Sequence, residues 1–96
     1  MEQLNRIRDM EESYREASAI LPALQAALDA YARLRPRLAE LDAYYTSPAW
    51  KADFAADEAG ELPPDLPRGV LSEDGLWDLL QMQRSLQEQM ADLAQK

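Results

Sequence analysis

A heptad seam of apolar side chains in the first half of the chain constrains its fold more than any other feature. Between Met10 and Tyr31 the apolar positions alternate in steps of four and three residues, which is the repeat by which one helix packs against another. A three-residue step to Leu34 shifts the phase, as a stammer does, and the alternation then resumes. The spacing predicts one long amphipathic helix over residues 2–45. Its apolar positions are Leu4, Ile7, Met10, Tyr14, Ala17, Leu21, Leu24, Leu28, Tyr31, Leu34, Leu38, Leu41 and Tyr45.

Pro22 and Pro36 interrupt this predicted helix. A proline inside a helix removes one backbone hydrogen bond and clashes with the preceding turn, at a cost of about 3 kcal/mol. The residues before them, Leu21 and Arg35, are poor helix caps. We therefore expect kinks near both prolines in a continuing helix, with a break near Pro22 as the alternative.

A short second helix is predicted over residues 47–59. Ser47 is a good N-cap and is followed by proline in the first helical position. Gly60 suits the left-handed conformation that ends many helices. Residues 60–71 contain three prolines, which predicts an extended loop.

The last helix is predicted over residues 72–94. Ser72 is its expected N-cap, and Glu73 and Asp74 lie in the first turn, where the helix dipole favours acids. At 1.5 Å per residue this helix is about 35 Å long, whereas the first is about 60 Å long. A hairpin of the two leaves part of the apolar seam uncovered, so we expect a homodimer or a partner helix to cover it. A bend at Pro22 into a compact bundle is the alternative.

The expected fold class is therefore all-α, in a single domain over residues 1–96. A long kinked N-terminal helix, a short middle helix and a proline-rich loop lead to a C-terminal helix packed antiparallel, as a coiled-coil-like hairpin or bundle.

Several kinds of chemistry are excluded by composition. The chain has no cysteine and no histidine, which removes disulfides, thiolate catalysis, the usual zinc sites and histidine acid–base catalysis. No nucleophile stands beside a base at a recognisable spacing, so we expect a non-enzyme with no catalytic residues, no metal ligands and no cofactor. With no targeting signal and no apolar run of about 20 residues, we expect a cytoplasmic protein with no membrane partner.

The negative charge is concentrated in the middle of the chain. The net charge is −8, and residues 42–78 hold nine acidic side chains against Lys51 and Arg68. Phosphate backbones are repelled by such a segment, so we expect no direct binding of nucleic acid.

Aromatic residues gather in the same region, Tyr44–Asp78, which we call the middle block. Trp50 and Phe54 share one face of the predicted short helix. A small aromatic core is the expected interpretation, with a ligand-binding aromatic box as the alternative. The aromatic residues of the middle block are Tyr44, Tyr45, Trp50, Phe54 and Trp77.

Asp57 projects between Trp50 and Phe54 on the predicted short helix, so its carboxylate needs a partner. We expect it to bond Arg68 or the free N–H groups of residues 72–75. The alternative is a divalent-cation site, because carboxylate clusters suit Mg²⁺, Mn²⁺ or Ca²⁺. Its ligands would be Asp53, Asp57, Glu58, Glu73 and Asp74.

The runs Y-Y-T-S-P-A-W-K-A-D-F from Tyr44, A-D-E from Ala56, L-P from Leu62 and R-G-V-L-S-E-D from Arg68 stand in this order. They resemble the pattern of a family of short bacterial proteins catalogued as a domain of unknown function, number 4298. That pattern favours an acid where this chain has Ala55, which further weakens a metal site in this turn. The resemblance implies a bacterial, all-helical protein and supplies no activity.

We therefore expect an acidic helical protein–protein interaction or scaffold module in the bacterial cytoplasm. A divalent-metal-binding protein and an acidic mimic of nucleic acid are the two alternatives. The candidate interaction residues are Tyr44, Tyr45, Ser47, Trp50, Asp53, Phe54, Asp57, Glu58, Arg68, Ser72, Glu73, Asp74 and Trp77.

Overall fold

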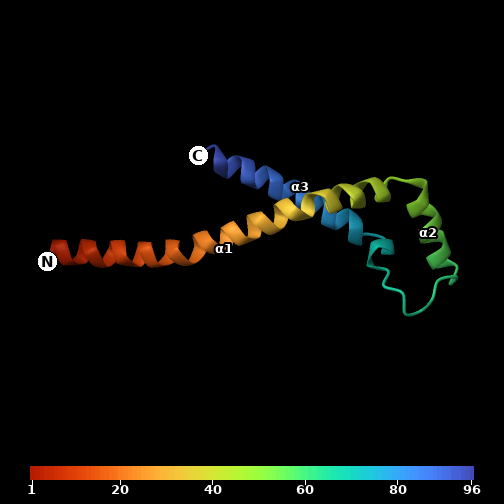
Figure 1. The fold of residues 1–96 in the computed structure, drawn as a ribbon, viewed down its shortest axis with the longest axis horizontal. Helices are drawn as coiled ribbons and strands as arrows, with labels where there is room; N and C mark the ends of the chain where they lie inside the picture. The colour runs from red at the N-terminus through yellow and green to blue at the C-terminus, as the bar shows by residue number, and fades with distance from the viewer. The chain divides into compact units, whose positions relative to one another are not determined.

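The fold is all-α, as predicted from the heptad spacing. A computed structural model describes residues 1–96 and contains three α helices, one 3₁₀ turn and no strand (Figure 1). The elements in chain order are α1 (Glu2–Tyr45), α2 (Pro48–Glu58), the 3₁₀ turn η1 (Gly69–Leu71) and α3 (Gly75–Ala94). No helix combines the length and the apolar character needed to cross a membrane.

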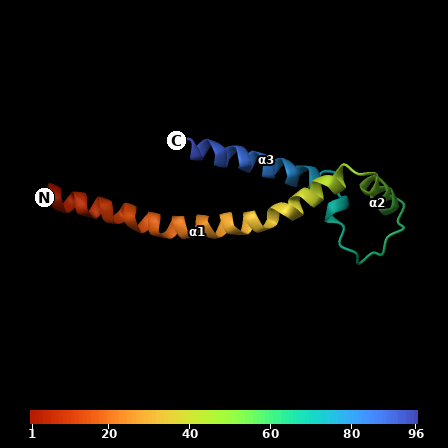
Figure 2. The same cartoon turned by 45° about the horizontal axis from the view of Figure 1, so that its top comes forward.

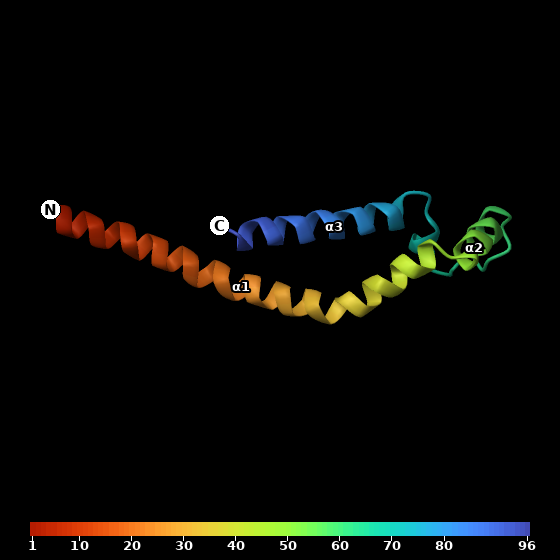
Figure 3. The same ribbon diagram turned by 90° about the horizontal axis from the view of Figure 1, so that it is seen from above.

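The helix α1 continues through both of its prolines. Its 44 residues include Pro22 and Pro36 without an interruption of the helical assignment, and Figure 3 shows an unbroken ribbon. The alternative of a break at Pro22 is therefore not what the chain adopts. A proline withdraws only its own backbone N–H, so the helix can resume at the next residue when the neighbouring side chains are good helix formers.

Two compact units divide the chain at Arg35. The first, Met1–Arg35, consists of Met1 and the first part of α1, and it contains no buried side chain. Its large apolar side chains are exposed throughout, apart from the partly covered Tyr31. The apolar seam of this unit therefore has no hydrophobic core of its own.

The second unit, Pro36–Lys96, holds the only core of the chain. Its four buried apolar side chains are each at most 6% exposed, and they come from the end of α1, from η1 and from α3. They are Leu38, Leu71, Leu76 and Leu80. The turn η1 contacts both α2 and α3, and Figure 2 shows the loop that leads from α2 to it. A one-turn element thus connects the two helices that follow α1.

Two predicted boundaries differ from the structure. The loop predicted over residues 60–71 ends in the 3₁₀ turn Gly69–Leu71, which buries Leu71. The last helix begins at Gly75 rather than at Ser72, because Ser72 ends η1 in an extended conformation and the first helical hydrogen bond joins the Asp78 N–H to the Asp74 carbonyl at 2.8 Å. The serine that looked like a helix cap therefore lies in the turn before the helix.

Candidate functional site

The short helix α2 begins and ends at the two signals predicted from the sequence, Ser47 and Gly60. The Ser47 hydroxyl accepts a hydrogen bond from the Trp50 N–H and donates one to the Tyr44 carbonyl. At the other end Gly60 has a φ of +72°, and the N–H groups of Gly60 and Glu61 bond the carbonyls of Asp57 and Ala56. This is the Schellman arrangement of a helix C-terminus. Local backbone chemistry therefore defines α2 at both ends.

Three aromatic rings lie in sequence along the start of the middle block. Tyr45 meets Trp50 edge to face with ring centroids 5.1 Å apart, and Trp50 stacks on Phe54 at 5.2 Å. The Trp50 indole Nε1 donates a hydrogen bond of 2.8 Å to the Val70 carbonyl. Each ring is half-buried. The rings therefore pack on one another, and the indole joins α2 to η1.

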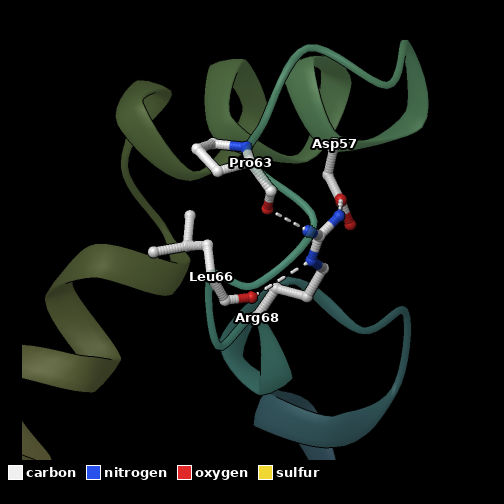
Figure 4. A network of polar contacts seen from close by, with 4 residues as sticks. All are labelled: Asp57, Pro63, Leu66 and Arg68. Carbon is white, nitrogen blue, oxygen red and sulfur yellow. Dashed lines mark hydrogen bonds and ion pairs between the residues drawn. The ribbon is translucent and has the colours of Figure 1, made fainter.

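Arg68 is the centre of the polar contacts in the loop after α2 (Figure 4). Its Nη1 donates to the Asp57 Oδ1 at 2.6 Å, its Nη2 to the Pro63 carbonyl, and its Nε to the Leu66 carbonyl at 3.3 Å. The Asp57 and Arg68 side chains are 19% and 33% exposed, so water screens the pair only in part. Of the two partners expected for Asp57, the structure thus has Arg68. One guanidinium holds the loop backbone in two places and ties it to α2.

A second carboxylate of α2 has a partner that the sequence did not suggest. The Tyr44 hydroxyl donates a hydrogen bond of 2.6 Å to the Asp53 Oδ2. This bond, with some loss of hydration and the nearby negative charge of Asp53, raises the pKa of Tyr44 from 10.0 to about 12. The two residues are nine positions apart and lie on either side of the Ser47 turn. No periodic pattern pairs such positions, although both residues were among the candidates.

Ser72 organises the turn that leads into α3. Its hydroxyl donates to the Gly69 carbonyl at 2.9 Å and accepts from the Gly75 N–H at 3.1 Å. Gly75 has no room for a side chain here, because a Cβ would lie 2.1 Å from the Ser72 Oγ. The N-cap residue of α3, Asp74, makes no side-chain capping bond. The need for glycine at position 75 was missed by sequence reasoning, because a glycine inside a predicted helix gives no sign of what lies against it.

The remaining candidates are exposed and are not brought together. Glu58, Glu73 and Asp74 are exposed side chains, and Trp77 is 50% exposed. No group of three or more acidic residues is arranged to hold a metal ion, while Asp53 and Asp57 already have the partners described above. The divalent-cation site and the nucleic-acid mimic stay predictions.

An apolar groove of about 390 Å³, open to solvent, lies in the unit Pro36–Lys96. We call it the η1 groove. Leu41 contributes from α1, and Leu76 and Leu79 from α3. Pro67, Gly69, Val70 and Gly75 complete its lining. Leu41 is a heptad position, but no sequence pattern predicted that the three separate stretches lining this surface would meet.

The comparisons with known proteins identify a family and nothing beyond it. The family model described as "Domain of unknown function (DUF4298)" matches residues 7–93. No curated protein and no solved structure is similar to the chain. Because the match spans most of its length, the chain belongs to this family, in agreement with the resemblance seen in the middle block.

Proposed function

We propose that the chain, as a member of a family whose description names no activity, is a non-enzymatic helical interaction module of the bacterial cytoplasm. It self-associates through the seam of α1 within Met1–Arg35. The observation that carries this proposal is the exposure of that seam. Eight large seam side chains of this unit are between 39% and 71% exposed: Leu4, Ile7, Met10, Tyr14, Leu21, Leu24, Leu28 and Leu34.

The heptad spacing of apolar residues in Met1–Arg35 is not explained by a helix that stays isolated in water. A lone helix in water is marginally stable, and packing of its apolar face supplies most of a helix's stability in proteins. A helix designed to remain solvated needs no apolar residues at alternating steps of four and three, whereas a helix that packs on another helix requires them. The spacing and the exposure together therefore favour a second helix on this face.

The size of the seam predicts a reversible association. Burying the remaining exposed half of each large side chain contributes about 1 kcal/mol. Eight such side chains on each of two copies give a gross gain of the same order as the association cost of about 4–15 kcal/mol. We therefore expect a dimer that dissociates on dilution.

Light scattering of the protein as it elutes from a size-exclusion column, loaded over a range of concentrations, tests this proposal. The wild-type chain should approach twice its 10.9 kDa mass at high concentration and fall to 10.9 kDa on dilution. Leu24→Glu places a charge on the seam and should give 10.9 kDa throughout. Ala26→Glu adds the same charge two residues away, on the opposite face, and should behave as wild type.

A wild-type chain that remains a monomer at every concentration, with the helix content of the structure retained, would contradict self-association. Equal behaviour of the two charged variants would do the same, since charge alone and not the seam would then control the mass.

A further inference from the structure

The η1 groove lies outside the seam proposed for self-association, and its surroundings define the kind of partner that fits it. Two of its lining side chains, Val70 and Leu79, remain 40% and 45% exposed. A Cβ added at Gly69 would meet no heavy atom within 4 Å. The groove therefore has unfilled apolar space that the chain itself does not occupy.

The groove is poorly suited to a small molecule. Its volume of about 390 Å³ is near the low end of the range of about 300–1,000 Å³ for small-molecule pockets, which bury most of the ligand. Here the space opens to solvent, and its lining side chains are all apolar or absent. An apolar side chain carried by a larger partner needs neither enclosure nor converging polar groups, so it fits this groove better.

Every stretch of chain that lines the η1 groove also carries an exposed acid within two residues of a lining residue. On α1 and the loop these are Glu40 and Asp42, on either side of Leu41, and Asp65, two residues before Pro67. Before and within α3 the exposed acids are Glu73, Asp74 and Asp78. Each of the three stretches that line the η1 groove therefore carries at least one exposed acid close in sequence to a lining residue.

The basic residues near these acids do not cancel this charge. Arg68 is bonded to Asp57 on α2. Arg84 lies 3.8 Å from Asp42, in a pair of side chains that are each more than half exposed, and such pairs contribute little. A concentration of one sign of charge around an apolar surface raises the local concentration of oppositely charged partners and repels those of like charge.

We propose that the η1 groove binds a basic amphipathic helix of another protein. The helix inserts one apolar side chain against Val70 and Leu79, and its lysine or arginine side chains pair with the exposed acids that lie close in sequence to the lining residues. Nucleic acid and anionic membranes are disfavoured because they carry the same sign of charge as these acids. The binding mode is a helix laid on an apolar groove, in which shape selects the apolar residue and charge selects the partner class.

A model peptide tests this proposal on the full chain. The probe is a fluorescently labelled helix of leucine and lysine about 15 residues long, with its leucines on one face. Fluorescence anisotropy should show binding that weakens as salt is added. A peptide of the same composition, scrambled so that the leucines share no face, should bind at least about tenfold more weakly. A peptide with glutamate in place of lysine should not bind.

Substitutions in the groove distinguish binding in the groove from attraction of the peptide by charge alone. Gly69→Leu adds a large apolar side chain at a residue that lines the groove and should weaken binding by about tenfold or more. Ala55→Leu adds a leucine at an exposed position of α2 and should leave binding unchanged. Leu79→Gln is a second test that does not depend on the tolerance of position 69, because Leu79 is already half exposed. Circular dichroism checks that each variant is folded.

Three results would overturn the proposal. Equal binding of the amphipathic and scrambled peptides, or full binding by Gly69→Leu and Leu79→Gln, would show that charge alone attracts the probe. Loss of binding in Leu24→Glu with full binding by the groove variants would show that the peptide occupies the seam of α1. None of these results decides whether the chain self-associates, which light scattering tests separately.

Discussion

The two units of this chain are stabilised by different means. Met1–Arg35 contains one stretch of helix and no buried side chain, while Pro36–Lys96 contains several elements and holds all four buried leucines. In the second unit the side-chain hydrogen bonds each join one particular donor to one particular acceptor, and most of these pairs are close together in the sequence. The comparison teaches that the heptad repeat alone buries no side chain in Met1–Arg35, whereas the core forms where the end of α1 is joined by η1 and α3.

The largest expected effect comes from the small core. Leu80→Ala should lower the free energy of unfolding by about 2–5 kcal/mol, because it removes one of only four buried apolar side chains. Leu93→Ala makes the same change in α3 at a position that is 63% exposed and should change stability by less than about 0.5 kcal/mol. Urea unfolding followed by circular dichroism measures both.

The dependence of stability on protein concentration should differ between the two units. The loss in Leu80→Ala should be the same at every protein concentration, since the core lies within one chain. Leu24→Ala, in the seam of Met1–Arg35, should reduce stability only where the chain self-associates. A concentration-dependent loss in Leu80→Ala would contradict the separation of the two units.

The polar ties of the loop come next. Asp57→Ala should cost about 1–3 kcal/mol, in the lower part of that range because both partners are partly exposed. Arg68→Ala should cost more, since the Pro63 and Leu66 carbonyls lose their donor as well. Lys51→Ala, an exposed lysine on α2, is the control. A loss below about 1 kcal/mol in both test variants would show that the loop does not depend on this pair.

The turn before α3 provides a matched pair of glycines. Gly75→Ala should cost about 1 kcal/mol, because its Cβ displaces the Ser72 hydroxyl and removes the capping bond. Gly69→Ala meets no atom within 4 Å and should be nearly neutral. In a Ser72→Ala background the further change Gly75→Ala should cost much less, and a double-mutant cycle measures that coupling. Additive losses would contradict the proposed steric cause.

The smallest effect is a dependence on high pH. Tyr44 has a pKa of about 12 in the folded chain, above its ordinary value of 10.0. Its bond to Asp53 therefore stabilises the fold fully below pH 10, and this contribution is lost as the pH rises from 10 towards 12. Tyrosinate absorbance should show one of the four tyrosines titrating late in the wild type and at the ordinary pH in Asp53→Asn. An unchanged titration in that variant would exclude Asp53 as the cause.

Sequence reasoning reached the features whose chemistry is local. The caps Ser47 and Gly60 fit α2 because the residues that bond them lie within a few positions. The Asp57–Arg68 pair could be anticipated because residues 42–78 contain only two basic side chains. A heptad repeat over the first half of the chain was sufficient to predict the length of α1.

The rest depends on contacts that a linear pattern does not encode. The start of α3 was placed three residues early because S-E-D-G serves equally as a helix cap or as a turn, and only the contact with Gly69 decides between them. The Tyr44–Asp53 bond and the η1 groove arise from stretches brought together by folding. Whether a second molecule covers the α1 seam is the subject of the proposal above, and one chain alone does not identify that molecule.

The indole hydrogen bond between Trp50 and Val70 has a consequence for spectroscopy. The chain has two tryptophans, and one indole N–H is bonded to a carbonyl 20 residues away while Trp77 is 50% exposed. In an NMR spectrum the Trp50 indole proton should therefore exchange with deuterium slowly and the Trp77 proton quickly. In one spectrum the exchange rate of the Trp50 proton thus reports on the opening of the contact between α2 and η1, and the Trp77 proton reports on the surface of α3.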